Sequence, residues 1–467
     1  KQPGLVVSHG TGSGKTLSSI GAVVDLSPNR ARVLVPAALK KNYEKEVSKH
    51  VRGKLPVEVE SLQKAIVSGK PPRGDMIVVD EAHRVRNPSR KGYQLLSKSK
   101  AEKRMLMTAS PVYNKPEDIA PLVNLAAGRR ELPMGIEFDR RYVKKPGTGF
   151  LSLINPFAAK EPKLVRKKEL GRVLNNWVDY HGGNDEGFPD LEEERVDVPM
   201  SKRQSRLHSH AWGKLPYVLR MRLRRGLPPE KKDLPAINMF QSQTRQISSS
   251  ERKFSVGQPA TSPKIQAAVT RLKGRIGEDK KHRALVYANY LNTLDEYAEE
   301  LDKKKVPYAM FRGDMGKRKR DDAVKRLNSG KVKALLVSGA GGEGLDLRGV
   351  RQVQVLEPHW NEEKLTQVIG RARRYGSHAH LPPEDRNVKV ERYASYPQGL
   401  LGREKGIEEV LYDMSAQKHR LNNQVLKLMT KQSQEKKPGA DFYRAYFKWK
   451  KQQPKNSIQD EWLLGPA

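Results

Sequence analysis

The sequence predicts an α/β protein with two parallel-sheet domains in tandem, a helical or irregular insertion between them, and a helical C-terminal region. In two separate stretches, short continuously apolar runs alternate with helical patterns, as is typical of parallel strands buried on both faces. A chain of 467 residues has room for about three domains of ordinary size. We therefore expect domains at 1–150 and 259–397, separated by 151–258 and followed by 398–467.

The expected strands are the apolar runs themselves. In the first domain they lie at 5–7, 32–35, 76–79 and 105–107, and in the second at 284–287, 334–337 and 352–356. The insertion holds a further expected strand at 194–200 and a basic run at 220–225. After it, a helix is expected from Ile407 to about Gln434, because apolar residues recur there at helical spacing: Val410, Leu411, Met414, Leu421, Val425 and Leu428.

The amino-acid composition limits which kinds of binding partner and site the protein can have. Lys and Arg number 89 against 53 Asp and Glu, a net charge of +36 that favours a polyanion, with nucleic acid first. This balance alone separates neither DNA from RNA nor either from an acidic lipid surface. The absence of cysteine excludes disulfides, thiolate metal sites and cysteine nucleophiles. No stretch approaches 18 apolar residues, so we expect no membrane-spanning helix.

A glycine-rich motif lies directly after the first apolar run and before a helical pattern. Backbone N–H groups of such a turn approach a nucleotide's phosphates closely, and the following helix contributes its positive dipole end. Lys15 would hold the β- and γ-phosphates, and Thr16 a Mg²⁺ ion. The nucleotide-binding residues expected here are Gly10, Thr11, Gly12, Ser13, Gly14, Lys15 and Thr16. One departure is His9, which stands where the usual pattern has its first glycine.

An acidic pair follows the run at 76–79. Asp80 is expected to ligate Mg²⁺ together with Thr16, and Glu81 to orient and deprotonate the attacking water. His83, two residues on, would sense the bound nucleotide or link it to the next motif. On its own such a pair is equally typical of a solvated turn, and the preceding glycine-rich motif favours the catalytic interpretation.

Arginines in the second domain complete the expected catalytic set. A planar guanidinium stabilises the charge on a departing γ-phosphate better than an ammonium does. Arg371 and Arg374 would reach the nucleotide only when both domains close on it, and Gln367 lies one helical turn before Arg371. Arg373 points elsewhere on a helix. The catalytic residues expected are Lys15, Asp80, Glu81, Gln367, Arg371 and Arg374.

Taken in order, these motifs resemble those of superfamily 2 helicase-like ATPases, most closely the Swi/Snf-like DNA translocases. Residues 80–83 spell the DEAH box, and segments similar to motifs Ia, III, V and VI lie at 35–46, 108–114, 338–347, and 360–361 with 367–374. The resemblance implies two RecA-like domains of the P-loop NTPase fold, a helical brace after the second, and ATP and Mg²⁺ as cofactors.

The resemblance also implies residues that couple the nucleotide to nucleic acid: His83, Thr108, Ser110, Gly342, Gly344 and Asp346. Alternatives stay open at the level of single residues. The two hydroxyls after the run at 105–107 would serve equally as helix caps, and the motif V segment as an ordinary loop. The basic run at 220–225 suits a phosphate backbone or a solvated helix face. The aromatic residues of 442–451 suit base stacking, although their helical spacing favours packing.

The section after motif VI, at 374–388, and the helix from Ile407 resemble helicase-like ATPases of large DNA viruses and phages, such as poxvirus-type nucleoside triphosphate phosphohydrolase I and the viral early transcription factor ATPase subunit. This implies an intracellular ATPase, in a virion or infected cell, that moves along duplex DNA within a transcription or DNA-processing assembly. Because the chain begins Lys1-Gln2-Pro3-Gly4, we expect its natural N-terminus, with the adenine-recognition segment, to lie upstream.

Two alternatives remain open on the sequence alone. One is a DEAH-type helicase that unwinds RNA or DNA, since RNA is a possible track for the same fold. The other is a basic nucleic-acid-binding module whose ATPase activity has lapsed. Retention of the expected catalytic residues argues against the second alternative.

Overall fold

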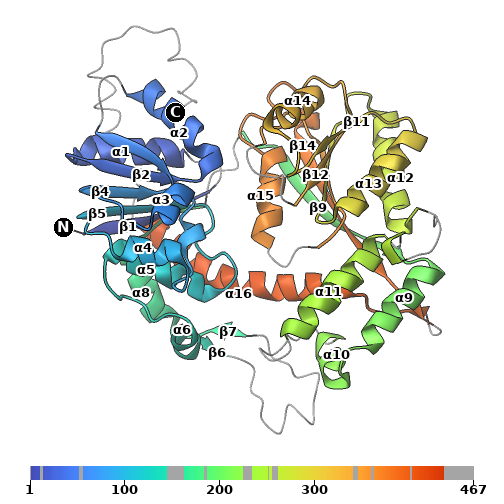
Figure 1. Cartoon of the computed structure of the whole chain (residues 1–467), viewed down its shortest axis with the longest axis horizontal. Helices are drawn as coiled ribbons and strands as arrows, with labels where there is room; N and C mark the ends of the chain where they lie inside the picture. Colours follow the sequence, from blue (N-terminus) through green and yellow to red (C-terminus); the bar gives the residue numbers. More distant parts are fainter. Residues whose placement is uncertain are drawn as a thin grey trace. The chain divides into compact units, whose positions relative to one another are not determined.

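The structure is a computed structural model. It describes residues 2–10, 14–51, 56–144, 162–182, 187–224, 234–250, 252–254, 261–339, 345–358, 362–399 and 402–435. The chain forms two compact units (Figure 1). The first unit comprises 1–112, 116–183 and 424–467, and the second comprises 113–115 and 184–423.

A six-stranded sheet of order β3-β2-β4-β5-β1-β8 forms the first unit, and each printed pairing in it is parallel. Helices cover both of its faces, with α1 and α2 on one side and α4, α5 and α8 on the other (Figure 1). The strands are β1 (Gly4–His9), β2 (Ala31–Val35), β3 (Val57–Ser61), β4 (Met76–Val79), β5 (Lys103–Thr108) and β8 (Val178–His181).

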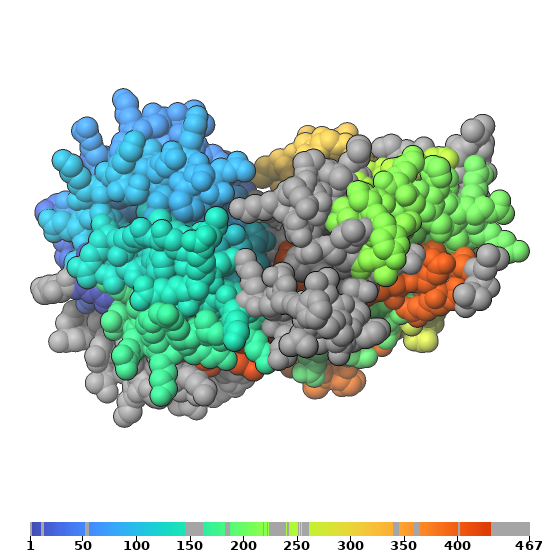
Figure 2. All heavy atoms as spheres, turned by 90° about the horizontal axis from the view of Figure 1, so that it is seen from below, coloured from blue at the N-terminus to red at the C-terminus, as the bar shows by residue number. Residues whose placement is uncertain are grey.

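The helices of the first unit are α1 (Lys15–Leu26), α2 (Lys40–His50), α3 (Leu62–Ser68), α4 (Lys91–Ser97), α5 (Ile119–Ala127), α6 (Ile136–Tyr142) and α8 (Lys167–Trp177). A short antiparallel pair joins β6 (Val143–Lys144) to β7 (Lys163–Leu164). Figure 2 shows the face of this unit over which α4 to α6 and α8 lie, coloured light blue to green.

Burial of apolar side chains on both faces holds the first sheet. Val33, Val35 and Val78 are fully buried and pack in one core with Ile20 and Val23 of α1. Because β1, β4 and β5 run parallel, their carboxyl ends meet at the same edge of the sheet, which is where ligands bind in open α/β sheets.

The second unit contains another six-stranded sheet, of order β11-β12-β10-β13-β14-β9, again with parallel pairings. Two apolar cores cover its two faces, one with α14 and α15 and the other with α12 and α13. The elements are β9 (Asp190–Pro199), α12 (Pro263–Glu278), β10 (Ala284–Ala288), α13 (Leu291–Lys303), β11 (Tyr308–Phe311), α14 (Lys317–Asn328), β12 (Ala334–Ser338), β13 (Gln352–Val355), α15 (Glu362–Ala372) and β14 (Asn387–Tyr396).

A helical cluster completes the second unit. Trp212 and Phe240 pack with Ile407, Val410 and other apolar residues in a separate core. Its elements are α9 (Lys202–Gly213), α10 (Tyr217–Arg224), α11 (Leu234–Ser249), the hairpin of β15 (Gln398–Gly399) and β16 (Gly402–Arg403), and α16 (Ile407–Glu435). Residues of α16 up to 423 belong to the second unit, and those from 424 onward to the first.

The fold class predicted from the sequence is confirmed, and each expected apolar run lies in a strand. The segment expected as an insertion, at 151–258, contributes to both units: α8 and β8 extend the first, and β9 to α11 belong to the second. The strand expected at 194–200 is β9, which pairs with β14 along its whole length. The basic run lies in α10 as far as Arg224, while 442–451 lies outside the described residues.

Within the described ranges, none of the helices combines the length and apolar character that crossing a bilayer requires.

Candidate nucleotide site and its coupling residues

Lys15 is the first residue of α1. Gly14 precedes it with φ +77°, a left-handed conformation that favours glycine. Lys15 Nζ donates hydrogen bonds to the carbonyl oxygens of His9, at 3.0 Å, and Gly10, at 2.9 Å. Burial lowers the pKa of Lys15, while the carboxylates of Glu81 and Asp80 act to raise it. The ammonium therefore lies within the field of the acidic pair.

Thr16 follows in the first turn of α1 and is half-buried. The other predicted nucleotide-binding residues, Thr11, Gly12 and Ser13, lie outside the described residues.

Asp80 is the first residue after β4 and is only 9% exposed. Its backbone N–H donates to the carbonyl of Leu34 on β2, at 2.8 Å, which fixes the carboxylate at the sheet edge. Burial and the neighbouring charge of Glu81 raise the pKa of Asp80 to about 6. One carboxylate oxygen, Oδ1, accepts the backbone N–H of Glu81 at 2.9 Å.

Glu81 adopts φ 50°, in the left-handed region that residues other than glycine rarely enter. Burial acts to raise the pKa of Glu81, but the hydrogen bond and charge of His83, with the charge of Lys15, outweigh it and hold that pKa below its ordinary value. Glu81 is therefore an ionised carboxylate at neutral pH.

His83 connects the acidic pair to the end of β5. Its Nδ1 lies 3.3 Å from Oε2 of Glu81 and 3.2 Å from Oγ1 of Thr108. Thr108 is fully buried, and its hydroxyl oxygen also accepts the backbone N–H of Ser110 at 3.0 Å. The hydroxyl of Thr108 thus closes a turn after β5 and contacts His83, and does not cap a helix. The structure brings the predicted residues Glu81, His83, Thr108 and Ser110 into one contact chain.

In the second unit, Gln367 and Arg371 lie one turn apart on α15, and both are half-buried. Arg374 follows the helix and forms an ion pair with Asp346, Nη1 to Oδ1 at 3.2 Å. The structure therefore joins a predicted residue of motif V to one of motif VI. Gly342 and Gly344 lie outside the described residues.

Arg373 is the first residue after α15 and contacts a different segment from Arg374. Its Nε donates to the carbonyl of Pro189, at 2.9 Å, and its guanidinium carbon lies 5.4 Å from the ring centre of Phe188.

Comparison with known proteins identifies the family of this chain. The model of the SNF2-related domain matches residues 59–252, and that of the helicase conserved C-terminal domain matches 264–376. A protein of Acanthamoeba polyphaga mimivirus, named as a candidate ATP-dependent RNA helicase, is 30% identical over 90% of this chain and 91% of its own length. This chain belongs to the SNF2-related helicase-like ATPases. It is an ATP hydrolase of helicase superfamily 2, as its predicted resemblance implies.

More distant relatives of this SNF2-related ATPase follow the same pattern. A termination factor NPH-I homolog of African swine fever virus is 23% identical over 90% of this chain and 74% of its own length. A DNA repair and recombination protein RAD54-like of Drosophila virilis is 23% identical over 80% of this chain, which spans about half of that relative (56%). The solved SWI2/SNF2 ATPase core of Sulfolobus solfataricus in complex with dsDNA matches with a TM-score of 0.36 at 19% identity, covering 84% of each chain. The family assignment rests on the sequence matches.

The donor set of this ATPase suits a magnesium ion held through phosphate. Thr16 and Asp80 offer a hydroxyl and a carboxylate, the hard oxygen donors that Mg²⁺ prefers. In the described part of the chain, no group of three or more histidine or acidic side chains is arranged to hold a metal. Mg²⁺ is commonly bound by one or two protein oxygens plus substrate phosphates and water, and the residues present fit that mode.

Sequence reasoning missed two contacts around the site. The hydroxyls of Tyr43, on α2, and Ser19, on α1, lie 2.6 Å apart and tie the two helices together. Asp179, on β8, lies 2.8 Å from Nε2 of His9. Nothing in the sequence signals the second contact, because 170 residues separate its partners.

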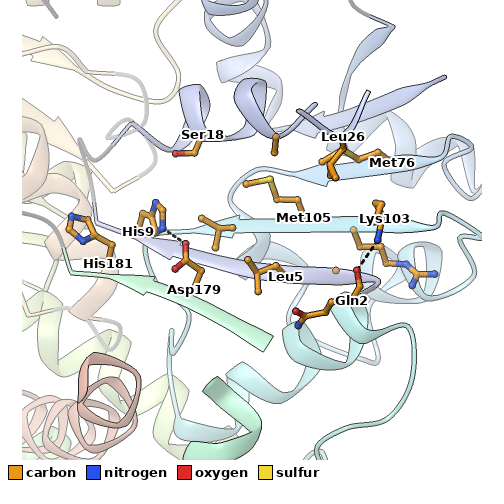
Figure 3. A pocket seen from close by; sticks show the side chains of 14 residues that line it. Gln2, Leu5, His9, Ser18, Leu26, Met76, Lys103, Met105, Asp179 and His181 are labelled. Atoms are coloured by element: carbon orange, nitrogen blue, oxygen red, sulfur yellow. Dashed lines mark hydrogen bonds and ion pairs between the residues drawn. The ribbon is translucent and has the colours of Figure 1, made fainter. Parts of the chain in front are cut away.

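A cavity of about 460 Å³ lies beside β1, β5 and β8 in the same unit (Figure 3). Its middle is lined by apolar residues such as Leu5 and Met105. Its polar residues gather at the two ends, with His9, Asp179, His181 and Ser18 at the carboxyl end of β1, and Gln2 and Lys103 at the other.

Proposed function

We propose that this ATPase couples hydrolysis to translocation along nucleic acid, with duplex DNA as its track, in the transcription machinery of a large DNA virus. The observation that carries the proposal is the match of residues 59–252 to the SNF2-related domain model. The names of two relatives support it, a DNA repair and recombination protein and a viral termination factor homolog. The net charge of +36 suits a track of phosphates.

The first unit would perform the chemistry as follows. The glycine-rich motif and Lys15 would bind the phosphates, and Thr16 and Asp80 would hold Mg²⁺, which would neutralise phosphate charge. Glu81 orients the attacking water. Because its pKa is low, Glu81 positions that water as an ionised acceptor and is a weak base.

Coupling would begin at His83. Its Nδ1 contacts both Glu81 and Thr108, so a change in the charge next to Glu81 alters a hydrogen bond at the end of β5. Ser110, bound through its N–H to the same threonine hydroxyl, would respond in turn. We propose this contact chain as the route by which the nucleotide state reaches the nucleic-acid-binding surface.

The arginines of the second unit would stabilise the departing phosphate, with Gln367 contacting the nucleotide or its water. Arg374 is paired with Asp346, which is 65% exposed, and a pair of that exposure is weak. Arg374 can therefore exchange the carboxylate for a phosphate at little cost, and this exchange would report hydrolysis to motif V.

RNA is the second candidate track. The mimivirus relative, 30% identical over nearly its whole length, is named as an RNA helicase candidate. If duplex DNA is the track, duplex DNA should stimulate ATP turnover; if RNA is the track, RNA alone should do so.

The experiment compares steady-state ATP hydrolysis by the purified chain alone and with duplex DNA, single-stranded DNA or single-stranded RNA of matched sequence. Duplex stimulation, together with ATP-dependent displacement of a third strand from a triplex, supports the proposal. Stimulation by RNA alone overturns it in favour of an RNA helicase. Lys15→Ala and Arg371→Ala are the controls, and both are expected to abolish the stimulated rate.

A further inference from the structure

His9 occupies the position at which the phosphate-binding pattern has its first glycine, and it is the last residue of β1. A glycine there has no side chain to restrain the turn. In this chain the residue carries an imidazole, and its surroundings in the first unit show what that imidazole contacts.

Two contacts tether the start of the turn to the edge strand β8. His9 Nε2 lies 2.8 Å from Oδ2 of Asp179, and the backbone N–H of Gly10 donates to the carbonyl of His181 at 2.9 Å. The strand register explains both, because His9 pairs with His181 and Val7 with Asp179. Side chains two residues apart share a face, so Asp179 lies on the same side of the sheet as His9 (Figure 3).

The imidazole is enclosed more than its partner. His9 is 14% exposed and Asp179 is 47% exposed. The ring of His181 stands edge-on to the ring of His9, with centroids 5.9 Å apart. The imidazole therefore has a carboxylate partner and an aromatic neighbour, both supplied by β8.

The tethered residues are the ones that hold the catalytic lysine. Lys15 Nζ donates to the carbonyl oxygens of His9 and Gly10, at 3.0 and 2.9 Å. The side chain of His9 and the backbone N–H of Gly10 bind to β8, and the carbonyl oxygens of the same two residues accept hydrogen bonds from Lys15. The position of the lysine thus depends on a strand that lies 170 residues away in the sequence.

We propose that His9 and Asp179 are positioning residues for nucleotide binding. They hold His9, whose carbonyl accepts a hydrogen bond from Lys15, against β8 before the nucleotide arrives, and so restrict the conformations that binding must otherwise order. Neither side chain touches the reacting atoms. The inference rests on the assignment of Lys15 to the nucleotide site, and it concerns affinity more than the chemical step.

The test measures ADP binding directly, with a fluorescent ADP analogue, alongside KM and kcat for ATP on the full chain. His9→Gly restores the usual glycine, and Asp179→Ala removes the partner. Each is expected to weaken ADP binding and to raise KM about five-fold, the effect of one ordinary hydrogen bond, because Asp179 is half exposed, with kcat changed less than two-fold. The double variant is expected to bind ADP no more weakly than either single variant.

Two further variants separate positioning from general stability. Asp179→Asn keeps a hydrogen-bond acceptor and is expected to recover most of the ADP affinity. Asp25→Ala removes an exposed carboxylate from the last turn of α1 and is expected to bind ADP as the unmodified chain does. Thermal unfolding of all variants is measured in parallel.

The proposal is overturned if His9→Gly and Asp179→Ala bind ADP normally, or if Asp179→Asn is as impaired as Asp179→Ala. It is also overturned if the losses in affinity follow the losses in melting temperature. Because Lys15→Ala should weaken binding in every background, a failure of the nucleotide-site assignment would show as normal ADP binding by that variant.

Discussion

Oγ1 of Thr108 lies 3.2 Å from Nδ1 of His83, in the interior of the first unit. The contact joins the segment after β4, which carries the acidic pair, to the segment after β5, where Ser110 is bound to the same hydroxyl. Since β4 and β5 are neighbours in the sheet, we expect a shift of His83 to displace Thr108 at the end of the adjacent strand. His83, Thr108 and Ser110 therefore form one hydrogen-bonded group.

Thr108→Val tests this group. Valine keeps the shape of threonine and removes the hydroxyl, so we expect basal ATP turnover to change less than three-fold while the stimulation by nucleic acid falls about ten-fold, the effect of losing buried hydrogen bonds. The ratio of stimulated to basal rate is the measurement. Thr108→Ser, which keeps the hydroxyl, should retain that ratio, and equal losses in both variants would contradict the role given to the hydroxyl.

Asp80→Asn should stabilise the free protein at neutral pH while abolishing activity. Folding raises the pKa of Asp80 from 3.8 to about 6, so the native state binds the proton more tightly and its stability falls as pH rises through that interval. The variant lacks this cost. We expect its free energy of unfolding to exceed that of the unmodified chain by roughly 1–3 kcal/mol above pH 6, and to equal it below pH 4.

Thermal unfolding between pH 3.5 and 7.5 without magnesium measures that difference, which corresponds to several degrees in melting temperature. Asp25→Asn, a change at an exposed carboxylate, is the matched control. A difference that grew towards acid pH would contradict the raised pKa.

Most of the strands that sequence reasoning found, such as β4 and β12, are apolar on both faces, although β9 was found despite its charges. Among the strands it missed, three carry charges for identifiable reasons. β3 and β8 are edge strands, with Glu58 and Asp179 at positions that a central strand would fill with apolar residues. β14 lies inside the second sheet but contains Glu391, a fully buried carboxylate that accepts from Gln352, Gln354 and Tyr393. Tertiary contacts satisfy that charge, and no local pattern reveals it.

The site divides in the same way. Asp80 and Thr108 could be predicted because each stands at or next to the end of an apolar run, and parallel strands bring such ends together. Lys15 could be predicted from the glycine-rich motif that precedes it. Asp179 could not, since its role depends on the register of β8 against β1. The spacing of motifs along the chain therefore predicts the expected catalytic residues. A residue that positions them, such as Asp179, can be found only when it is known which distant strand pairs at the edge of the sheet.

Lys264→Met should be among the most destabilising single changes in the second unit. Lys264 Nζ lies 2.7 and 2.8 Å from the two carboxylate oxygens of Glu408, and both side chains are fully buried. The pair fixes the start of α16 to α12. Removing only the lysine leaves a buried carboxylate without its cation, at a cost of about 3–5 kcal/mol.

Urea unfolding of Lys264→Met, Glu408→Gln and the double variant measures this coupling. Because burial raises the pKa of Glu408, neutral glutamine suits the site better than an unpaired carboxylate. We expect the double variant to be more stable than Lys264→Met alone. Additive losses would show that the two side chains contribute independently.

Salt should control the affinity for nucleic acid more than sequence does. A net charge of +36 implies that binding releases counterions from many phosphates. If six or more phosphates are neutralised, the Kd for duplex DNA should rise by about 10³-fold between 50 and 200 mM salt. Fluorescence anisotropy with a labelled duplex measures the slope, and ADP affinity over the same range is the control, because its site is formed by few charges. If the Kd for duplex DNA did not change with salt, the basic residues would not be neutralising DNA phosphates. The net charge would then no longer support nucleic acid as the track.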